Sequence, residues 1–402
     1  MEVSIFEGIQ KIVQNVKKLK TKIVPLENAI GKISAKTLKA TIALPRFNNS
    51  AMDGYGLKGE HQTYKIVGKI LAGDDIDIEL RDAECIKITT GARTPKSIDK
   101  VIPQEHTTSH DNTITIQKEL KHFANIRKKG EDIQEEEIVI NDGDKITSNY
   151  ISLLASQGIT HIEVYQTPRV AIFASGSELK MPYESLGNAQ IYNSNTPYLH
   201  ARSLELGCDV TFIGKSEDNL ESLKSLIANS LEYDLIVTSG GVSVGEADFT
   251  KEAFKAFDME TAFDKVTIKP GKPTNFGMIG STVVLNLPGN PLAASLNYEI
   301  FGKLIINCLS GKQNIYQNFL STKMSKDFKK TRAVDTIIPG FFNGEKFTPA
   351  KQFGANMVNI LNHCNGFLVI ASETDEIKEG EVVKFLPIDW CFESSEVVDF
   401  LS

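Results

Sequence analysis

Apolar residues near the N-terminus recur with the spacing of a helix. Ile5, Ile9, Ile12 and Val16 fall on one face, with polar residues such as Glu7 between them. Charged side chains interrupt the apolar run, which is not typical of a secretory signal peptide. The pattern predicts an amphipathic helix that packs against another part of the protein.

The pattern then changes to short apolar stretches separated by turns. Residues 41–120 contain TYKIVGKI, CIKITTG, KVIP and NTITIQ between Gly, Pro and Asp residues, which is typical of a β-rich segment. Helical spacing returns later, with Thr147 or Ser148 as the expected N-cap and Gly158 as the expected end. We therefore expect residues 41–120 to be a β-rich domain inserted into a small α+β domain, which consists of residues 1–40 and 121–167.

Residues 168–310 alternate strand-like and helix-like stretches. RVAIFA is a continuous apolar run of the kind found in buried parallel strands, and DLIVTS, DKVTIKP and STVVLNL are further strand candidates. Helices are predicted in NSNTPYLHARSLEL, SEDNLESLKSLIANS and PLAASLNYEIFGKLIINCL. The alternation predicts a doubly wound α/β domain whose ligand site lies beyond the C-terminal ends of the strands.

Residues 311–402 return to short strands and turns, as in TIIPGFFNGEKFTPA and GFLVIAS. This pattern predicts a small β-barrel or sandwich. A chain of 402 residues is also longer than one ordinary core requires. The overall expectation is a multidomain α/β fold.

Composition and charge narrow the class of protein. The net charge of −7 does not favour a nucleic-acid partner. Five scattered cysteines form no CxxC pair, which indicates reduced thiols and a cytoplasmic location. No apolar run approaches the roughly 18 residues that a membrane span needs. We expect a cytoplasmic protein that binds neither nucleic acid nor membrane.

The strongest chemical signal follows the predicted strand DLIVTS. Glycines let backbone N–H groups converge on an anion, and the helix expected near Asp248 adds positive potential at its N-terminus. A tight turn without a ligand is the alternative, and the sequence favours phosphate binding. LPGNP forms a second turn of this kind after the next strand. The candidate binding residues of the two loops are Ser239, Gly240, Gly241, Ser243, Gly245, Pro288, Gly289 and Asn290.

Charged residues are expected at the same edge of the sheet. Lys269 and Lys272 flank a proline-stiffened turn in IKPGKP, and two ammonium groups held close together favour an anion between them. Two exposed turn lysines are the alternative. Glu178 and Asp248 would suit Mg²⁺ held partly by substrate phosphates, although either acid alone is more typical of a surface position. The seven histidines show no ligand spacing, so neither a catalytic zinc nor a hydrolytic triad is predicted.

Eight motifs in order along the chain carry a resemblance to a known family. They are NNSAMDGYG, TGARTP with VIPQE, RKKGEDI, ASGSEL, SNTPYL, DLIVTSGGVSVGEADFTK, IKPGKP and LPGNP. Together they resemble the molybdopterin molybdenumtransferases, which include bacterial MoeA and the gephyrin E domain. The resemblance implies an elongated four-domain protomer that forms a homodimer, and Mg²⁺-dependent insertion of molybdate into adenylylated molybdopterin with release of AMP. It also implies a molybdopterin adenylyltransferase as a partner.

The resemblance assigns roles to individual residues. Matching motif by motif, the active-site positions are Asp53, Thr90, Asp132, Glu178, Asp248, Lys269 and Lys272. Of these, Glu178 and Asp248 are the implied metal ligands, and Thr90 and Asp132 contact the substrate. The site is expected between the α/β domain of one subunit and the β-rich segment of the other. Ser177 and Ala293 depart from the family, which commonly has Asp and Ser there.

Two other functions remain as alternatives. A molybdopterin adenylyltransferase shares an α/β domain with a similar SGG loop, but it normally lacks the N-terminal and C-terminal regions present here. A scaffold of the gephyrin E-domain type would retain the shell without turnover. The presence of the acids and lysines favours the transferase, since a scaffold has no need of them.

Overall fold

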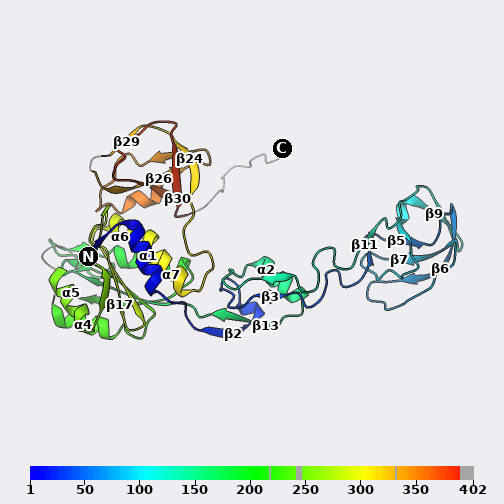
Figure 1. The fold of residues 1–402 in the computed structure, drawn as a ribbon, viewed down its shortest axis with the longest axis horizontal. Coiled ribbons are helices and arrows are strands. Elements are labelled where there is room, and N and C mark those ends of the chain that lie inside the picture. The colour runs from blue at the N-terminus through cyan, green and yellow to red at the C-terminus, as the bar shows by residue number, and fades with distance from the viewer. Residues whose placement is uncertain (217–218, 241–246, 331–332, 390–402) are drawn as a thin grey trace.

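The computed structural model describes residues 1–216, 219–240, 247–330 and 333–389, with the side chains of residues 247 and 248 excepted. The molecule is elongated (Figure 1). An α/β body and a β-barrel lie at one end, a small body around α2 lies in the middle, and a separate β-rich body lies at the other end. Long paired segments connect the middle body to the β-rich one.

The α/β body is built on a six-stranded mixed sheet in the order β17-β14-β18-β23-β22-β19. The first four strands are parallel to one another, and the pairs β23–β22 and β22–β19 are antiparallel. Apolar runs form these strands because both faces of the sheet are covered. The strands are β14 (Arg169–Ser175), β17 (Asp209–Ser216), β18 (Leu235–Ser239), β19 (Glu260–Phe263), β22 (Asn275–Ile279) and β23 (Thr282–Leu287).

Helices cover both faces of this sheet, so the doubly wound prediction is confirmed (Figure 1). Val170 and Ile172 of β14 pack on one side, while Ala171 and Phe173 pack on the other, as the period of two requires. One face carries α3 (Asn195–Glu205), α6 (Pro291–Asn297) and α7 (Lys303–Leu309), the last two joined through a π-helical turn at Tyr298–Gly302. The other carries α4 (Leu220–Ala228) and α5 (Ala247–Lys255).

The predicted N-terminal helix is present as α1 (Ile5–Asn15). Ser4 begins it with a capping box, in which Ser4 and Glu7 each accept a backbone hydrogen bond from the other. Its apolar face packs into the core of the α/β body beside Phe263 and Phe301. The preceding strand β1 (Glu2–Val3) pairs with β20 (Lys265–Val266). The N-terminus therefore helps to build the body that carries the candidate pocket.

The middle body has its own small core. Leu26, Val139, Leu154 and Val164 pack together in it. Thr147 is the N-cap of α2, as predicted. The elements are β2 (Thr21–Pro25), a 3-10 turn (Leu26–Asn28), β3 (Leu38–Lys39), β12 (Ile138–Ile140), α2 (Ser148–Ser156) and β13 (His161–Tyr165). The strand pairs β2–β13 and β3–β12 are both antiparallel.

The β-rich body is a six-stranded sheet in the order β8-β5-β7-β6-β10-β9. Its two apolar faces have separate cores, one around Ile70 and Ile86 and one around Tyr64 and Ile102. A short pair, β4 (Asn49–Ser50) with β11 (Ile126–Arg127), joins it to the connecting segments. The strands are β5 (Gly54–Leu57), β6 (Thr63–Ile70), β7 (Glu84–Ile88), β8 (Lys100–Pro103), β9 (Thr107–His110) and β10 (Thr113–Ile116), with a 3-10 turn at Gln104–His106.

The C-terminal part closes into a five-stranded barrel, as predicted. The pairings β26–β27, β27–β24, β24–β30, β30–β28 and β28–β26 form a complete ring around Phe347 and Phe385. The ring strands are β24 (Leu320–Met324), β26 (Asp335–Phe342), β27 (Lys346–Pro349), β28 (Gly366–Ile370) and β30 (Val382–Pro387). Outside it lie the pair β25 (Phe328–Lys329) and β29 (Glu376–Ile377) and a 3-10 helix at Asn359–His363.

One strand prediction is wrong. The segment DKVTIKP does not complete the central α/β sheet, because β20 pairs with β1 and β21 (Ile268–Lys269) pairs with β26 of the barrel. The IKPGKP turn therefore lies at the junction between the α/β body and the barrel. No helix in the described ranges is long and apolar enough to cross a membrane.

Candidate functional site

The two predicted loops meet at one edge of the α/β sheet. Ser239, the last residue of β18, is paired in register with Leu287, the last residue of β23. A Cβ atom at Gly240 would lie 2.3 Å from the carbonyl oxygen of Ser175, and the φ angle of Gly240 is +95°. Only glycine fits this close contact between neighbouring strand ends. Ser239, Gly240, Pro288, Gly289 and Asn290 all line a single pocket of about 980 Å³.

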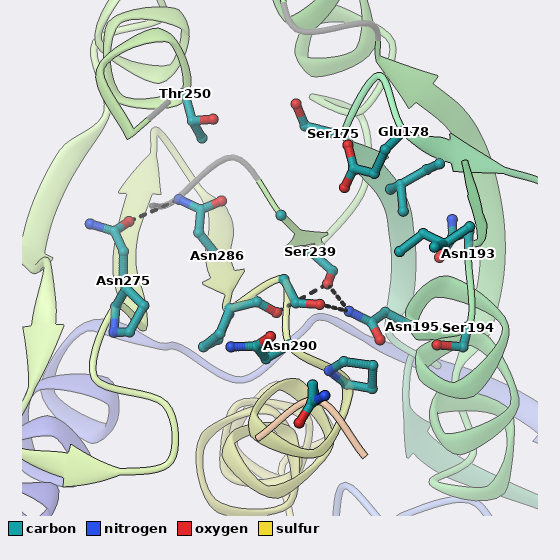
Figure 2. Close-up of a pocket in the computed structure, with 18 of the residues that line it drawn as sticks. Ser175, Glu178, Asn193, Ser194, Asn195, Ser239, Thr250, Asn275, Asn286 and Asn290 are labelled. Carbon is teal, nitrogen blue, oxygen red and sulfur yellow. Dashed lines mark hydrogen bonds between the residues drawn. The ribbon is translucent and has the colours of Figure 1, made fainter. Parts of the chain in front are cut away.

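Asn195 links the two loops (Figure 2). Its side-chain nitrogen donates to Ser239 Oγ at 2.7 Å and to the carbonyl oxygen of Gly289 at 2.8 Å. Ser239 Oγ in turn donates to the carbonyl oxygen of Pro288 at 3.2 Å. These bonds join the first turn of α3 to the ends of two strands. The floor of the pocket is therefore held in place before any ligand binds.

A second hydrogen-bond chain runs along another wall of the pocket (Figure 2). Thr238 Oγ1 donates to Asn286 Oδ1 at 2.7 Å, and Asn286 Nδ2 donates to Asn275 Oδ1 at 2.9 Å. All three residues are buried. The chain leaves Asn275 Nδ2 without a hydrogen-bond acceptor among the described residues, while Asn275 lines the pocket. This wall presents an N–H donor to a ligand.

Glu178 lies on the opposite side of the pocket, beside Ser175 (Figure 2). Its carboxylate is exposed, and it has no hydrogen bond or ion pair with another described residue. Both carboxylate oxygens are therefore available to a hard cation or to a ligand N–H group. The described residues contain no group of three or more His, Cys, Asp or Glu side chains placed to hold a metal ion.

The IKPGKP turn is fixed against α6. A Cβ atom at Gly271, where φ is +114°, would lie 1.8 Å from Asn297 Nδ2, so glycine is required. The buried Asn297 side chain donates to the carbonyl oxygen of Pro270 at 3.1 Å and accepts from Thr274 Oγ1 at 3.1 Å. Lys272 Nζ pairs with Glu2 at 2.8 Å, a partner that the sequence pattern did not indicate.

A second pocket of about 910 Å³ lies between this turn and the barrel. It shares Lys272, Pro273, Pro288 and Asn290 with the first pocket, so the two are continuous. Lysines are the dominant charged residues in its wall, which Asp327 also lines. They are Lys269, Lys272, Lys326, Lys329, Lys330 and Lys351. Such a wall attracts small anions.

The barrel also caps the loop that follows β23. The carbonyl oxygen of Ala355 accepts hydrogen bonds from the backbone N–H groups of Leu292 at 2.9 Å and Ala293 at 3.4 Å. These are N–H groups of the first turn of α6, which would otherwise have no partner within the helix. The LPGNP turn therefore has fewer N–H groups for an anion than its sequence suggests, and the barrel contributes directly to the site.

The β-rich body brings together two other candidate residues. Asp53 Oδ1 accepts a hydrogen bond from the backbone N–H of Thr90 at 2.7 Å. That bond lowers the pKa of the exposed Asp53 carboxyl below its ordinary value. In Figure 1 these residues belong to the end of the molecule opposite the α/β body. Asp132 is exposed, beside the connecting segments, where its backbone N–H donates to Leu44.

The candidate residues are thus divided between distant parts of one chain. The structure brings Glu178, Ser239, Gly240, Lys272 and the LPGNP loop to one pair of pockets, and it places Asp53, Thr90 and Asp132 elsewhere. Gly241, Ser243, Gly245 and the Asp248 side chain lie outside the described residues. The roles predicted for them stay predictions.

Sequence reasoning missed several residues of the pocket. Asn195, Asn275 and Asn286 received no role, although Asn195 lies in the SNTPYL motif. Their only signal was an amide side chain next to a predicted strand end or helix start. The barrel lysines gave no local signal, because closure of the barrel brings them to the turn. The buried Cys85 and Cys208 behave as structural thiols, since burial raises the pKa of each to about 12.

Comparison with known proteins agrees with this architecture. Residues 3–158 match the family model of the MoeA N-terminal region (domain I and II), and residues 171–307 match that of a probable molybdopterin binding domain. A structure of the molybdopterin biosynthesis MoeA protein from Pyrococcus horikosii superimposes with a TM-score of 0.82 at 26% identity. That alignment covers 97% of this chain and all of the other.

Curated relatives match over nearly their whole length. The molybdopterin molybdenumtransferase of Staphylococcus epidermidis is 31% identical over 95% of this chain and 94% of the relative. The enzyme of the same name from Staphylococcus aureus is 30% identical over 94% of this chain and 97% of the relative. The chain belongs to the molybdopterin molybdenumtransferase (MoeA) family, which acts in molybdenum cofactor biosynthesis.

Proposed function

We propose that this chain, as a molybdopterin molybdenumtransferase, inserts molybdate into adenylylated molybdopterin and releases AMP in an Mg²⁺-dependent reaction. One observation carries the proposal: two pockets of different chemistry are continuous at Lys272, Pro273, Pro288 and Asn290. One pocket is lined mainly by amides and hydroxyls, together with two carboxylates and three lysines, whereas lysines are the dominant charged residues of the other. A pterin nucleotide and an oxyanion would meet at the shared wall.

The lysine pocket supports binding of molybdate. A dianion gains from several ammonium groups that the protein has already brought together. The Asn297 contacts hold the turn that carries Lys269 and Lys272, so little ordering is needed when the anion binds. Lys330 is 8% exposed and already donates to the carbonyl oxygens of Ala371 and Ser372. We therefore assign anion binding to the other lysines rather than to Lys330.

The amide pocket supports binding of the pterin nucleotide. Ser239 and Gly240 lie at the C-terminal end of a parallel strand, where ligands of doubly wound sheets bind. The Asn275 side chain offers an N–H group to a phosphate oxygen or to the heterocycle, while both N–H groups of Asn195 hold the two loops in place. Attack of water on the phosphoanhydride bond releases AMP and leaves the other phosphate on molybdopterin. The two dithiolene thiols then replace one oxygen of the molybdate in the lysine pocket, and that oxygen leaves as water.

The carboxylate in the pocket fits a magnesium requirement. Glu178 has both oxygens available, and oxygen donors are the ligands that Mg²⁺ prefers. Glu178 and Asp248 would hold the ion together with phosphate oxygens of the substrate. When bound, Mg²⁺ would stabilise negative charge that develops on the phosphoanhydride during cleavage.

We further propose that the active unit is a homodimer whose sites are shared. Asp53 and Thr90 carry family motifs, yet they lie at the end of the chain opposite the pockets (Figure 1). A second copy would bring its β-rich body to the pocket of the first, with Asp53 approaching the phosphates and Asp132 near the substrate. The adenylylated substrate would come from a molybdopterin adenylyltransferase, the proposed partner in the pathway.

The test is AMP release from adenylylated molybdopterin with Mg²⁺, measured with and without molybdate, together with the molybdenum content of the pterin product. Release that depends on molybdate and yields metal-loaded pterin is the expected result. Asp248→Asn and Lys272→Ala should each lower the rate, and wild-type rates would refute their assigned roles. Adenylylation of molybdopterin at the expense of ATP would identify an adenylyltransferase. Tight pterin binding without turnover would identify a scaffold.

A further inference from the structure

One buried hydroxyl group in the amide pocket has no partner. Thr250 lies in the first half of α5 and is only 3% exposed. Its Oγ1 forms no hydrogen bond within the part of the chain that the structure describes. Thr250 nevertheless lines the 980 Å³ pocket, and Figure 2 shows its hydroxyl oxygen directed towards the side of Ser175 and Glu178. The hydroxyl is therefore almost completely dehydrated, and it belongs to a residue in the wall of the pocket.

Other buried threonines of the α/β body form hydrogen bonds through their hydroxyl groups. Thr282, which is 4% exposed, donates to the carbonyl oxygens of Leu231 and Tyr233, each at 3.0 Å. Thr274 donates to Gly271 at 2.8 Å, and Thr238 donates to Asn286. Burial of a hydroxyl without a partner is unfavourable, because its bonds to water are lost and not replaced. The position of Thr250 is explained if a ligand supplies the partner.

The surroundings of Thr250 indicate an anionic ligand atom. Lys251 and Lys272 line the same pocket with 49% and 58% of their side chains exposed, and they pair with Asp264 at 3.4 Å and Glu2 at 2.8 Å. The N-terminus of α5, a helix of nine residues, adds positive potential. Asn275 Nδ2 is a further donor on the same wall (Figure 2). Donors and cations together favour a phosphate oxygen over a neutral group.

We infer that Thr250 is a positioning residue for the pterin nucleotide, and that its hydroxyl donates a hydrogen bond to a phosphate oxygen of the bound substrate. The inference rests on the proposed function and names one contact of that site. A phosphate oxygen of the substrate can belong to the AMP moiety or to the molybdopterin moiety. Both moieties offer a phosphate oxygen as the acceptor, and separate titrations with AMP and with molybdopterin distinguish them.

Three variants test the inference. Thr250→Val removes the hydroxyl and keeps the shape and nearly the same helix propensity. Thr250→Ser keeps the hydroxyl. Thr282→Val is the matched control, since it removes a buried hydroxyl that has partners and does not line the pocket. For each variant, Tm without ligand and the affinities for AMP and for molybdopterin, with Mg²⁺ present, are measured by calorimetry.

The expected results separate a ligand contact from a structural role. Thr250→Val should leave Tm unchanged or raise it, because no protein bond is lost, and should weaken binding of one of the two probes by about tenfold. Thr250→Ser should bind nearly as the wild type does. Thr282→Val should lower Tm and leave both affinities unchanged. The probe that Thr250→Val affects identifies the phosphate.

Two outcomes would overturn the inference, and they differ. If the wild type binds AMP or molybdopterin and Thr250→Val binds each of them equally well, the contact does not exist, while the proposed function stands. A fall in Tm of Thr250→Val with unchanged affinities leads to the same conclusion, because the hydroxyl would then serve the fold. If the wild type binds neither probe, the proposed function itself fails, and this contact fails with it.

Discussion

The α/β body and the β-rich body carry their candidate residues in opposite ways. In the α/β body, Asn195 and Asn286 are fixed by hydrogen bonds between different elements at the wall of a deep pocket. In the β-rich body, Asp53 is exposed and is held by the backbone N–H of Thr90. The first arrangement encloses a ligand. The second presents a fixed carboxylate to solvent.

The proposed shared site would account for the elongated shape (Figure 1). A cavity needs several packed elements, which the sheet, the helices and the barrel provide together. An acid at the far end of a long chain contributes to that cavity only when another molecule brings it there. In a closed dimer with twofold symmetry, each end of the molecule would contact the other end of its partner, and two equivalent sites would form.

The largest expected effect comes from removing the carboxylates of the two bodies one at a time. Asp53→Asn removes the carboxylate charge from one body, and Glu178→Gln removes it from the other. Each variant alone should release AMP about 10²- to 10³-fold more slowly than the wild type, as the loss of one charge-stabilising group typically does. When the two variants are co-expressed, half of the dimers are mixed and each of these has one intact site. Activity should then recover to about a quarter of the wild-type value.

The control for this complementation is a mixture of two variants on the same side. Glu178→Gln with Lys272→Ala changes the pocket in both chains, so no mixed dimer has an intact site and no recovery is expected. Recovery to the same level in both mixtures, or in neither, would show that the pocket and Asp53 do not meet across two chains. Sedimentation analysis of each mixture checks that dimers form.

Much of the fold follows from local pattern. The run RVAIFA became β14 because an apolar stretch of this length is stable only when both faces are covered, and helices cover both. Ser4 caps α1 because its side chain accepts a hydrogen bond from the N–H of Glu7. Thr147 is the N-cap of α2, where its backbone is extended. The ends of β18 and β23 lie side by side, as expected for neighbouring parallel strands of one sheet.

The remaining features depend on contacts between distant segments. The strand Ile268–Lys269 has a pattern that suits the central sheet, but it pairs with the barrel strand β26. Nothing near Glu2 indicates that it pairs with Lys272. Asn195 resembles an ordinary helix-start residue until folding brings Ser239 and Gly289 within hydrogen-bond distance. Local sequence shows which residues suit a site, whereas tertiary pairing decides which of them meet.

The next effect concerns stability and compares two buried cations. Arg202 of α3 pairs with Glu299 at 2.6 Å, and the Glu299 side chain is completely buried. Arg202→Met should lower the free energy of unfolding of the α/β body by about 3 kcal/mol, because it leaves a buried carboxylate without its counter-charge. Denaturant unfolding, followed by probes in each body, measures the change.

The matched variant lies in the β-rich body. Lys100 is buried and pairs with Glu60 at 2.6 Å, but the Glu60 side chain is 78% exposed. Glu60→Gln should cost less than about 1 kcal/mol, since solvent around the exposed Glu60 screens the pair and Lys100 also donates to the carbonyl oxygen of Leu120. Equal losses for Arg202→Met and Glu60→Gln would mean that burial of the carboxylate does not decide the effect.

A smaller effect is expected from the amide that links the two loops. Asn195→Ala removes both bonds, to Ser239 Oγ and to the carbonyl oxygen of Gly289, without touching a charged group. Binding of AMP should weaken by about tenfold, because the loops lose the support that holds them in a binding geometry. Asn362→Ala is the control, since Asn362 contacts Asn359 and does not line this pocket. Calorimetric titration of both variants measures the difference.

The smallest effect tests the exposed carboxylate itself. The N–H of Thr90 lowers the pKa of Asp53, so the folded protein holds the ionised form better than the unfolded chain does. A carboxyl group with a lowered pKa adds stability above its unfolded value, about 3.9, and loses it as the pH falls through the folded value. Asp53→Asn should therefore lower the Tm of the β-rich body by about 1 to 2 °C at neutral pH. Because the wild type loses this advantage once Asp53 is protonated, the difference in Tm should shrink as the pH falls below the ordinary pKa of an aspartate. A difference in Tm that persists in acid would show that the shape of the Asp53 side chain, rather than its charge, stabilises the fold.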